Sequence, residues 1–210
     1  MTSRDRLLLF TRYPEAGRTK TRLIPALGAC GATRLHKLLT EKTAIQANIL
    51  AEKYGVETVV YYSGGNKEKM TSWLGPLTFV PQVDGDLGLR MQAAFTHAFA
   101  EGVEKAVLIG SDIPSISADL LADAFAALQT AQVAIGPSLD GGYYLIGMRT
   151  DAAEKLYPVL FERMVWSTAM VFALTCERLG KTAIEVAVMP TLQDIDTPED
   201  LAFAGTHGLL

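Results

Sequence analysis

The chain has 210 residues, of which 49% are hydrophobic and 20% are charged, and its formal net charge at pH 7 is −4. This composition is that of a globular protein, and the length suits a single α/β domain, residues 1–210, rather than two domains. The mild acidity disfavours a nucleic-acid-binding protein. No apolar run approaches the roughly 20 residues that span a bilayer, and residues 1–6 lack a signal-peptide pattern, so we expect a cytoplasmic protein without a membrane span.

The cysteines and histidines do not indicate a metal centre. Cys30 and Cys176 are far apart in sequence and lack zinc-site spacing, so we expect both to be reduced and structural. His36, His97 and His207 are scattered, which favours surface or helix positions over a catalytic cluster.

A basic loop follows the first expected strand. Residues 7–10 form a short apolar run, typical of a strand buried on both faces of a parallel sheet. Pro14 and Gly17 then predict a turn, because proline restricts the residue before it and glycine permits a positive φ. Cations cluster around this turn: Arg12, Arg18, Lys20 and Arg22. Arginine forks, a lysine charge and backbone N–H groups suit a diphosphate or triphosphate, although a solvated surface loop would carry the same residues.

The following segments alternate between helix and strand. Leucines and isoleucines at helical spacing from residue 35 predict a long helix that ends near Gly55. Residues 56–62 and 77–81 predict strands, and residues 67–74 predict a short helix between them. This order indicates a β-α-β unit.

Residues 83–91, with the sequence VDGDLGLRM, predict a glycine-containing loop that leads into a helix. A helix N-terminus beside Arg90 suits contact with a nucleotide base or phosphate. Simple capping of the helix by Asp84 or Asp86 is the alternative.

Asp112 directly follows the next expected strand, residues 106–110. It would therefore lie at the carboxyl end of a strand, where open α/β sheets bind ligands. An aspartate beside a phosphate-binding loop is a candidate magnesium ligand, and capping of a turn is the alternative. Ser117 is expected to cap the helix that follows.

Residues 133–147 predict a hairpin with Asp140, Gly141 and Gly142 at the reversal. The glycines exceed what an ordinary hairpin requires, which favours a ligand lying against this backbone; a tight turn without a ligand is the alternative. Asp140 would then contact a sugar hydroxyl or a cation.

The last third of the chain contains a second pair of candidate acidic residues. Ser167 is expected to cap a helix that ends at Gly180, and residues 182–189 predict a strand. Thr197 is expected to cap the final helix, with Pro198, Glu199 and Asp200 in its first turn. Capping does not explain Asp194 and Asp196, whose carboxylates would repel each other unless a cation or hydrogen bonds are present.

Four motifs in this order resemble those of a known superfamily: PEAGRTKTRL, GSDIP, GPSLDGGYYLIG and DIDTPEDL. They look like the motifs of bacterial proteins in the nucleotide-diphospho-sugar transferase superfamily, which has the glycosyltransferase A fold and includes relatives of phospholactate guanylyltransferase and molybdenum-cofactor nucleotidyltransferases. The resemblance spans nearly the whole chain. It implies a three-layer α/β/α domain with a mostly parallel, Rossmann-like sheet.

The resemblance also implies roles for individual residues. Asp112 would bind a divalent metal, magnesium or manganese, with Asp196 as the second ligand and Asp194 in reserve. The expected catalytic residues are Lys20, Arg22, Asp112 and Asp140. The expected nucleotide- or substrate-binding residues are Arg12, Gly17, Arg18, Lys20, Arg22, Gly88, Arg90, Gly141 and Gly142. Arg12 stands where a lysine is common in the family, and Ala16 where a second proline is frequent.

Two transfer reactions fit these motifs. In glycosyl transfer, a small acceptor's hydroxyl attacks the anomeric carbon of a nucleotide sugar and a nucleoside diphosphate leaves. In nucleotidyl transfer, a phosphate or carboxylate attacks the α-phosphorus of a nucleoside triphosphate and pyrophosphate leaves. The resemblance places glycosyl transfer first, whereas Ser111-Asp112-Ile113 lacks the Asp-x-Asp of many glycosyltransferases and favours the second reaction.

Two other classes of protein compete with these transferases. A non-catalytic nucleotide sensor with the same fold is one alternative, because fold does not fix function. A dinucleotide-dependent oxidoreductase is disfavoured, because no G-x-G-x-x-G follows the first strand.

Overall fold

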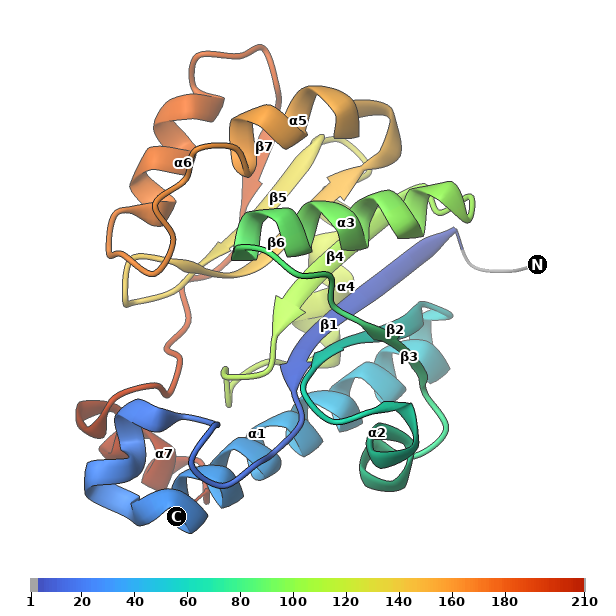
Figure 1. Ribbon diagram of the computed structural model, residues 1–210. Helices are drawn as coiled ribbons and strands as arrows, with labels where there is room; N and C mark the ends of the chain where they lie inside the picture. The colour runs from blue at the N-terminus through green and yellow to red at the C-terminus, as the bar shows by residue number, and fades with distance from the viewer. Residues whose placement is uncertain (1–3, 210) are drawn as a thin grey trace.

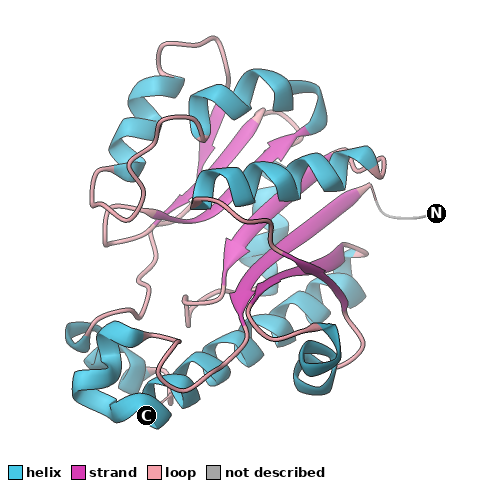
Figure 2. Ribbon diagram, viewed as in Figure 1, coloured by secondary structure: helices cyan, strands magenta, loops and turns pink. Residues whose placement is uncertain are grey.

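The computed structural model describes residues 4–209, which form a seven-stranded sheet between two layers of helices (Figures 1 and 2). The strands are β1 (Asp5–Arg12), β2 (Glu57–Ser63), β3 (Thr78–Pro81), β4 (Lys105–Gly110), β5 (Val133–Pro137), β6 (Tyr143–Arg149) and β7 (Val186–Val188). The α-helices are α1 (Ile24–Tyr54), α2 (Lys67–Leu74), α3 (Leu87–Ala100), α4 (Ala118–Ala127), α5 (Ala153–Leu160), α6 (Val171–Leu179) and α7 (Leu201–Thr206). Three short 3₁₀ helices are η1 (Thr21–Leu23), η2 (Thr150–Ala152) and η3 (Pro198–Asp200). None of the helices within residues 4–209 is long and apolar enough to cross a membrane.

The strand order is β3-β2-β1-β4-β6-β5-β7. Strand β6 is antiparallel to both of its neighbours, and the other neighbouring strands pair in parallel. The mostly parallel sheet is therefore confirmed, as is the antiparallel hairpin of β5 and β6. Because β1, β4, β5 and β7 run in one direction, their carboxyl ends lie at the same edge of the sheet.

Alternate residues of β1 pack into different cores. Leu7 and Leu9 belong to a cluster with residues of α1, α2 and α4, whereas Leu8 and Phe10 belong to a cluster with residues of α3, α5 and α6. Side chains alternate across a strand, so a strand covered on both faces reads as a continuous apolar run. The predicted three-layer α/β/α architecture is confirmed.

A third cluster joins the beginning of α1 to the end of the chain. Leu23, Leu35 and Leu39 pack with Ile195 and Leu209. In Figure 1, α7 lies beside the first turns of α1. This packing draws the segment that carries Asp194 and Asp196 toward the loop that precedes α1.

Several predicted helix ends are confirmed. Gly55 ends α1 with φ 70°, and the Ser117 side chain accepts a hydrogen bond of 3.2 Å from the Leu120 N–H at the start of α4. Thr197 and Asp200 form a capping box around η3. Asp200 is thus accounted for by helix initiation.

Other local predictions were wrong or missing. Ser167 does not cap α6, which begins after Met170; Ser167 instead has φ 62° in the preceding loop. The strand predicted over residues 182–189 is reduced to β7, because the Thr182 N–H donates to the Leu179 carbonyl in the turn that follows α6. Helix α5 was not predicted, and it contains Pro158.

Candidate active site

The candidate site lies where four strands end at one edge of the sheet. Strand β1 leads into the basic loop, β4 into Asp112, β5 into the turn with Asp140, and β7 into residues 194–196. The ends of β1 and β4 are adjacent, with Phe10 opposite Gly110. The basic loop and the predicted aspartates therefore come together at the edge where open α/β sheets bind ligands.

Lys20 connects the basic loop to two of the predicted metal ligands. Its Nζ lies 2.8 Å from Asp112 Oδ1 and 3.8 Å from Asp196 Oδ1, and it also donates to the carbonyl of Ile195. The Lys20 side chain is only 3% exposed. Its backbone is left-handed, with φ 45° and ψ 49°, a conformation that residues other than glycine seldom adopt. Asp112 and Asp196 thus face one shared positive charge.

Further contacts fix the two aspartates. The Ile195 N–H donates to the Asp112 carbonyl over 3.1 Å, which ties the two segments together. Arg22 Nη1 lies 2.7 Å from Asp196 Oδ2. Burial opposes ionisation of Asp112, but the adjacent Lys20 ammonium outweighs it and holds the pKa of this carboxyl below its ordinary value. Asp112 is therefore a carboxylate at neutral pH.

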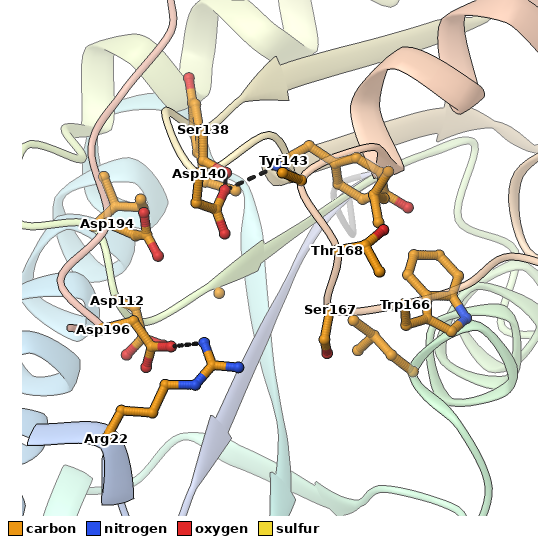
Figure 3. A pocket seen from close by; sticks show the side chains of 17 residues that line it. Arg22, Asp112, Ser138, Asp140, Tyr143, Trp166, Ser167, Thr168, Asp194 and Asp196 are labelled. Carbon is orange, nitrogen blue, oxygen red and sulfur yellow. Dashed lines mark hydrogen bonds and ion pairs between the residues drawn. The ribbon is translucent and has the colours of Figure 1, made fainter.

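Two cavities meet at this ion cluster, and Figure 3 shows the larger one. The larger has a volume of about 450 Å³, and its charged lining residues are Arg22, Asp112, Asp140, Asp194 and Asp196. The smaller has a volume of about 350 Å³, and its charged lining residues are Arg12, Arg18, Lys20, Asp112 and Asp196. One cavity is therefore mainly acidic and the other mainly basic, and Asp112 and Asp196 belong to both.

Asp140 and Asp194 face the same space in the larger cavity (Figure 3). Asp140 Oδ1 accepts hydrogen bonds from the Gly142 N–H, at 2.9 Å, and from the Ser138 hydroxyl. Burial and the neighbouring Asp140 carboxylate raise the pKa of Asp194 to about 6. It is Asp196, rather than Asp194, that shares a cation with Asp112.

The turn glycines have different surroundings. Gly141 has φ 87°, and a Cβ at this position would lie 2.1 Å from the carbonyl oxygen of Ala169. The Gly141 carbonyl also accepts a 2.9 Å hydrogen bond from the Phe172 N–H. The close approach predicted for a ligand at Gly141 is thus made by the chain itself, whereas Gly142 does line the larger cavity.

Gly88 and Arg90 line neither of the two cavities. Gly88 is buried, and a Cβ there would lie 2.8 Å from both the Phe161 carbonyl oxygen and the Trp166 ring. Arg90 Nε donates to the Gly85 carbonyl over 2.9 Å. Asp86 caps α3 by accepting a 2.8 Å hydrogen bond from the Leu89 N–H, so the capping alternative describes this segment.

Among the remaining basic-loop residues, Arg12 and Arg18 line the smaller cavity and Gly17 does not. Gly17 turns the loop with φ 80° and has open space where a Cβ would be. The Arg18 side chain is 76% exposed, with a 3.4 Å contact to Glu15. Arg12 Nη1 donates to the Arg18 carbonyl over 3.1 Å. Arg18 is therefore accessible to an anion entering from solvent.

The family of the chain is shown by comparison with known proteins. The model of a family described as an uncharacterized protein conserved in bacteria, DUF2064, matches residues 46–168, which is more than half of the chain. The chain belongs to the DUF2064 family. No curated protein matches this family member in sequence.

Solved structures with a similar fold were also found. A protein from Desulfovibrio desulfuricans G20, provisionally described as a nucleotide-diphospho-sugar transferase, is 33% identical over 99% of this chain and 94% of its own, with a TM-score of 0.85. CMP:2-keto-3-deoxy-manno-octonic acid synthetase in complex with CTP is 15% identical over 99% of this chain and 98% of its own, with a TM-score of 0.58. A protein from Mycobacterium tuberculosis H37Rv in complex with manganese is 15% identical over 95% of this chain and 96% of its own, with a TM-score of 0.54. The last two comparisons establish a common fold. The predicted membership of the nucleotide-diphospho-sugar transferase superfamily, with its glycosyltransferase A fold, is confirmed.

Sequence reasoning missed several polar residues of this DUF2064 site. His36 of α1 lines the smaller cavity, and its Nε2 lies 2.8 Å from the Arg12 carbonyl. Burial lowers the pKa of His36, so the ring is neutral and donates through Nε2, because a carbonyl only accepts. The Thr11 hydroxyl lies 3.2 Å from that of Thr40 and 3.1 Å from that of Ser111, beneath the same cavity. His36 and Thr40 lie on the buried stripe of a long helix, where the sequence signal is indistinguishable from that of core packing.

The acidic residues fit a divalent metal only in part. Within residues 4–209, no three histidine, cysteine or acidic side chains are gathered so as to hold a metal by themselves. Asp112 and Asp196 do face one cation, and their carboxylate oxygens are the donors that magnesium and manganese prefer. Magnesium commonly uses one or two carboxylates and takes its other ligands from substrate phosphates and water. The residues present fit such a shared site.

Proposed function

We propose that the chain is a metal-dependent transferase that binds a nucleotide diphosphate group and transfers a glycosyl group from it to a small acceptor. The observation that carries this proposal is the convergence of Lys20, Asp112 and Asp196 where a basic and an acidic cavity meet. A diphosphate needs cations along its length and a metal at its reacting end. The junction of the two cavities offers cationic side chains for the phosphates and carboxylates that would hold the metal.

The basic cavity suits the diphosphate. Arg12 and Arg18 line it, and the guanidinium of Arg18, which is exposed and only 3.4 Å from Glu15 at its nearest atom, would make forked bonds to phosphate oxygens. Gly17 gives the loop its sharp turn, with φ 80°. The two arginines would stabilise a nucleoside diphosphate as it leaves.

Asp112 and Asp196 are the residues that would hold magnesium or manganese. When bound, the metal would supply positive charge to the diphosphate and so favour its departure. Arg22, paired with Asp196, lies at the boundary with the larger cavity and would orient the end of the diphosphate nearest the acceptor. The manganese-bound neighbour of the same fold supports a divalent metal in this type of scaffold.

The larger cavity would hold the acceptor, and Asp140 is our candidate general base. Both hydrogen bonds to its carboxylate end on Oδ1, from the Ser138 hydroxyl and the Gly142 N–H. These bonds fix the carboxylate and leave Oδ2 for an acceptor hydroxyl. An acceptor held there could lose its proton to Asp140 as it attacks.

Nucleotidyl transfer is the second candidate because the segment after β4 lacks the Asp-x-Asp of many glycosyltransferases. Gly110 and Pro114 stand two residues before and after Asp112, where a second aspartate would be. The end of β4 therefore offers one carboxylate instead of two. The CTP complex of the cytidylyltransferase-type neighbour with the same fold is consistent with this branch.

A two-stage experiment tests the proposal. The first stage is a thermal-shift screen of nucleotide sugars and nucleoside triphosphates with and without magnesium, because a ligand that binds the folded state raises its apparent stability. The second stage follows the stabilising ligands by ³¹P NMR, with water or added sugars as acceptors. Release of a nucleoside diphosphate from a nucleotide sugar would support glycosyl transfer, and release of pyrophosphate from a triphosphate would support nucleotidyl transfer.

Asp112→Ala distinguishes an enzyme from a sensor. We expect it to abolish turnover while metal-free nucleotide binding persists. Asp119→Ala is the matched control, because Asp119 is an exposed aspartate that pairs with Lys53 and Tyr54 on the outside of α4. Binding without turnover in the wild-type protein would favour a sensor, and the absence of any stabilising nucleotide would contradict the whole proposal.

A further inference from the structure

The position of Lys20 conflicts with the simplest account of the site. A lysine that holds phosphate would be expected to extend into the basic cavity, yet its ammonium is buried between Asp112 and Asp196. These are the same carboxylates that would hold the metal. In the observed arrangement, a metal and the Lys20 ammonium would compete for the same oxygen atoms.

The two carboxylates that would hold the metal are already paired with cations. Asp112 and Asp196 contribute two negative charges, and Lys20 and Arg22 contribute two positive charges at ion-pair distance. Both carboxylates are thus already paired, and a divalent cation would have to displace an ammonium that lies 2.8 Å from Asp112 Oδ1. The free protein should therefore bind the metal weakly.

The smaller cavity offers the Lys20 ammonium a second position. It lines the smaller cavity together with Arg12 and Arg18, so a polyphosphate bound by these arginines would present oxygens to the same side chain. The lysine stem is long and flexible. The left-handed backbone of Lys20 is an uncommon conformation that the surrounding contacts maintain, and such conformations occur at sites that switch between states.

We propose that Lys20 is an internal cation that blocks the metal-binding carboxylates until a polyphosphate draws its ammonium into the basic cavity. This inference rests on the proposed function. It states that nucleotide and metal bind cooperatively, because each favours the arrangement in which Lys20 has left Asp112 and Asp196. The metal-binding pair would then be open only when a diphosphate is present to share the ion.

The test is the affinity of the nucleotide-free protein for Mn²⁺, measured by electron paramagnetic resonance of the unbound ion. We expect Lys20→Gln to tighten Mn²⁺ binding by about tenfold or more, within the usual range of coupling between sites. Arg18→Gln removes the same charge from the same loop, but Arg18 is exposed and pairs with Glu15 rather than with Asp112 or Asp196, so we expect no comparable change. Lys20→Arg keeps the charge and should retain weak binding.

Several outcomes would overturn the inference. These are unchanged or weaker Mn²⁺ binding in Lys20→Gln, an equal gain in Arg18→Gln, or saturation of the wild-type protein at micromolar Mn²⁺ without nucleotide. The last measurement needs no variant, and Lys20→Met provides a second charge-removing variant if Lys20→Gln does not fold. If the wild-type protein turns over nucleotides but Lys20→Gln leaves Mn²⁺ affinity unchanged, the inference fails and the proposed function stands. If no nucleotide binds or reacts, the proposed function itself fails.

Discussion

Substitution of Gly141 by alanine tests why this position requires glycine. Gly141→Ala places a Cβ in a left-handed backbone with φ 87°, and the same atom would lie 2.1 Å from the Ala169 carbonyl oxygen. The left-handed conformation costs about 1–2 kcal/mol in alanine. Overpacking against a backbone that cannot yield costs about 1–3 kcal/mol more. We therefore expect a loss of about 3 kcal/mol, which in a chain of this size lowers the Tm by about 6–12 °C.

Gly55→Ala is the matched control. Gly55 also has a positive φ, of 70°, but it is exposed at the end of α1, and an added methyl group would have nothing within 4 Å of it. Only the conformational cost, about 1 kcal/mol, applies there. We therefore expect the Tm of Gly55→Ala to fall by about 2–4 °C. Differential scanning calorimetry of both variants measures the difference. Equal Tm values for Gly141→Ala and Gly55→Ala would refute the claim that Ala169 is what requires glycine at position 141.

Two further predictions concern groups around the cavities. The pKa of Asp194 is raised from 3.8 to about 6, so its carboxyl releases its proton at a higher pH in the folded state than in the unfolded state. The folded protein therefore loses stability as the pH rises from 3.8 to about 6. Asp194→Asn should therefore gain Tm relative to the wild-type protein across this window, and a difference in Tm that does not vary with pH would contradict the assignment. Thr11→Val removes two hydroxyl contacts and should lose about 2 kcal/mol of unfolding free energy, whereas Thr40→Val removes one and should lose about 1 kcal/mol; urea denaturation checks the order of the two.

The fold was largely predictable because its signals are local. The apolar run at residues 7–10 is continuous because both faces of β1 are covered, and α2 was predicted with its observed bounds, Lys67–Leu74. The parallel direction of β1, β2 and β4 follows from the helices that join them. Strand β7 and helix α5 were not predictable in the same way. Three residues carry too little pattern to define a strand, and α5 contains a proline.

The sequence predicted which residues lie near one another in the candidate site better than it predicted the contacts between them. Chain order and strand ends were enough to predict that Asp112 would lie near the basic loop. They could not predict that Lys20 would turn away from solvent to pair with Asp112 and Asp196, because that depends on a left-handed backbone at a residue other than glycine. Gly141 was attributed to a ligand because glycine indicates a backbone that is approached closely, and Gly88 was assigned to the ligand pocket by the family resemblance. The sequence does not indicate that Trp166 and Ala169 are what lie against these two glycines.

The cluster of Lys20, Asp112 and Asp196 depends on the hydrophobic packing between α1, α7 and Ile195, outside the sheet. Ile195 is buried in the cluster formed by α1 and α7, its N–H holds the Asp112 carbonyl, and its own carbonyl accepts from Lys20. The residue between Asp194 and Asp196 is therefore an apolar anchor with both backbone groups committed to the site. Ile195 is anchored in this core, and both flanking aspartates line the larger cavity. The order Asp-Ile-Asp in the motif DIDTP thus has a physical basis. The isoleucine packs against α1 and α7, and the aspartates supply negative charge where the acidic and the basic cavity meet.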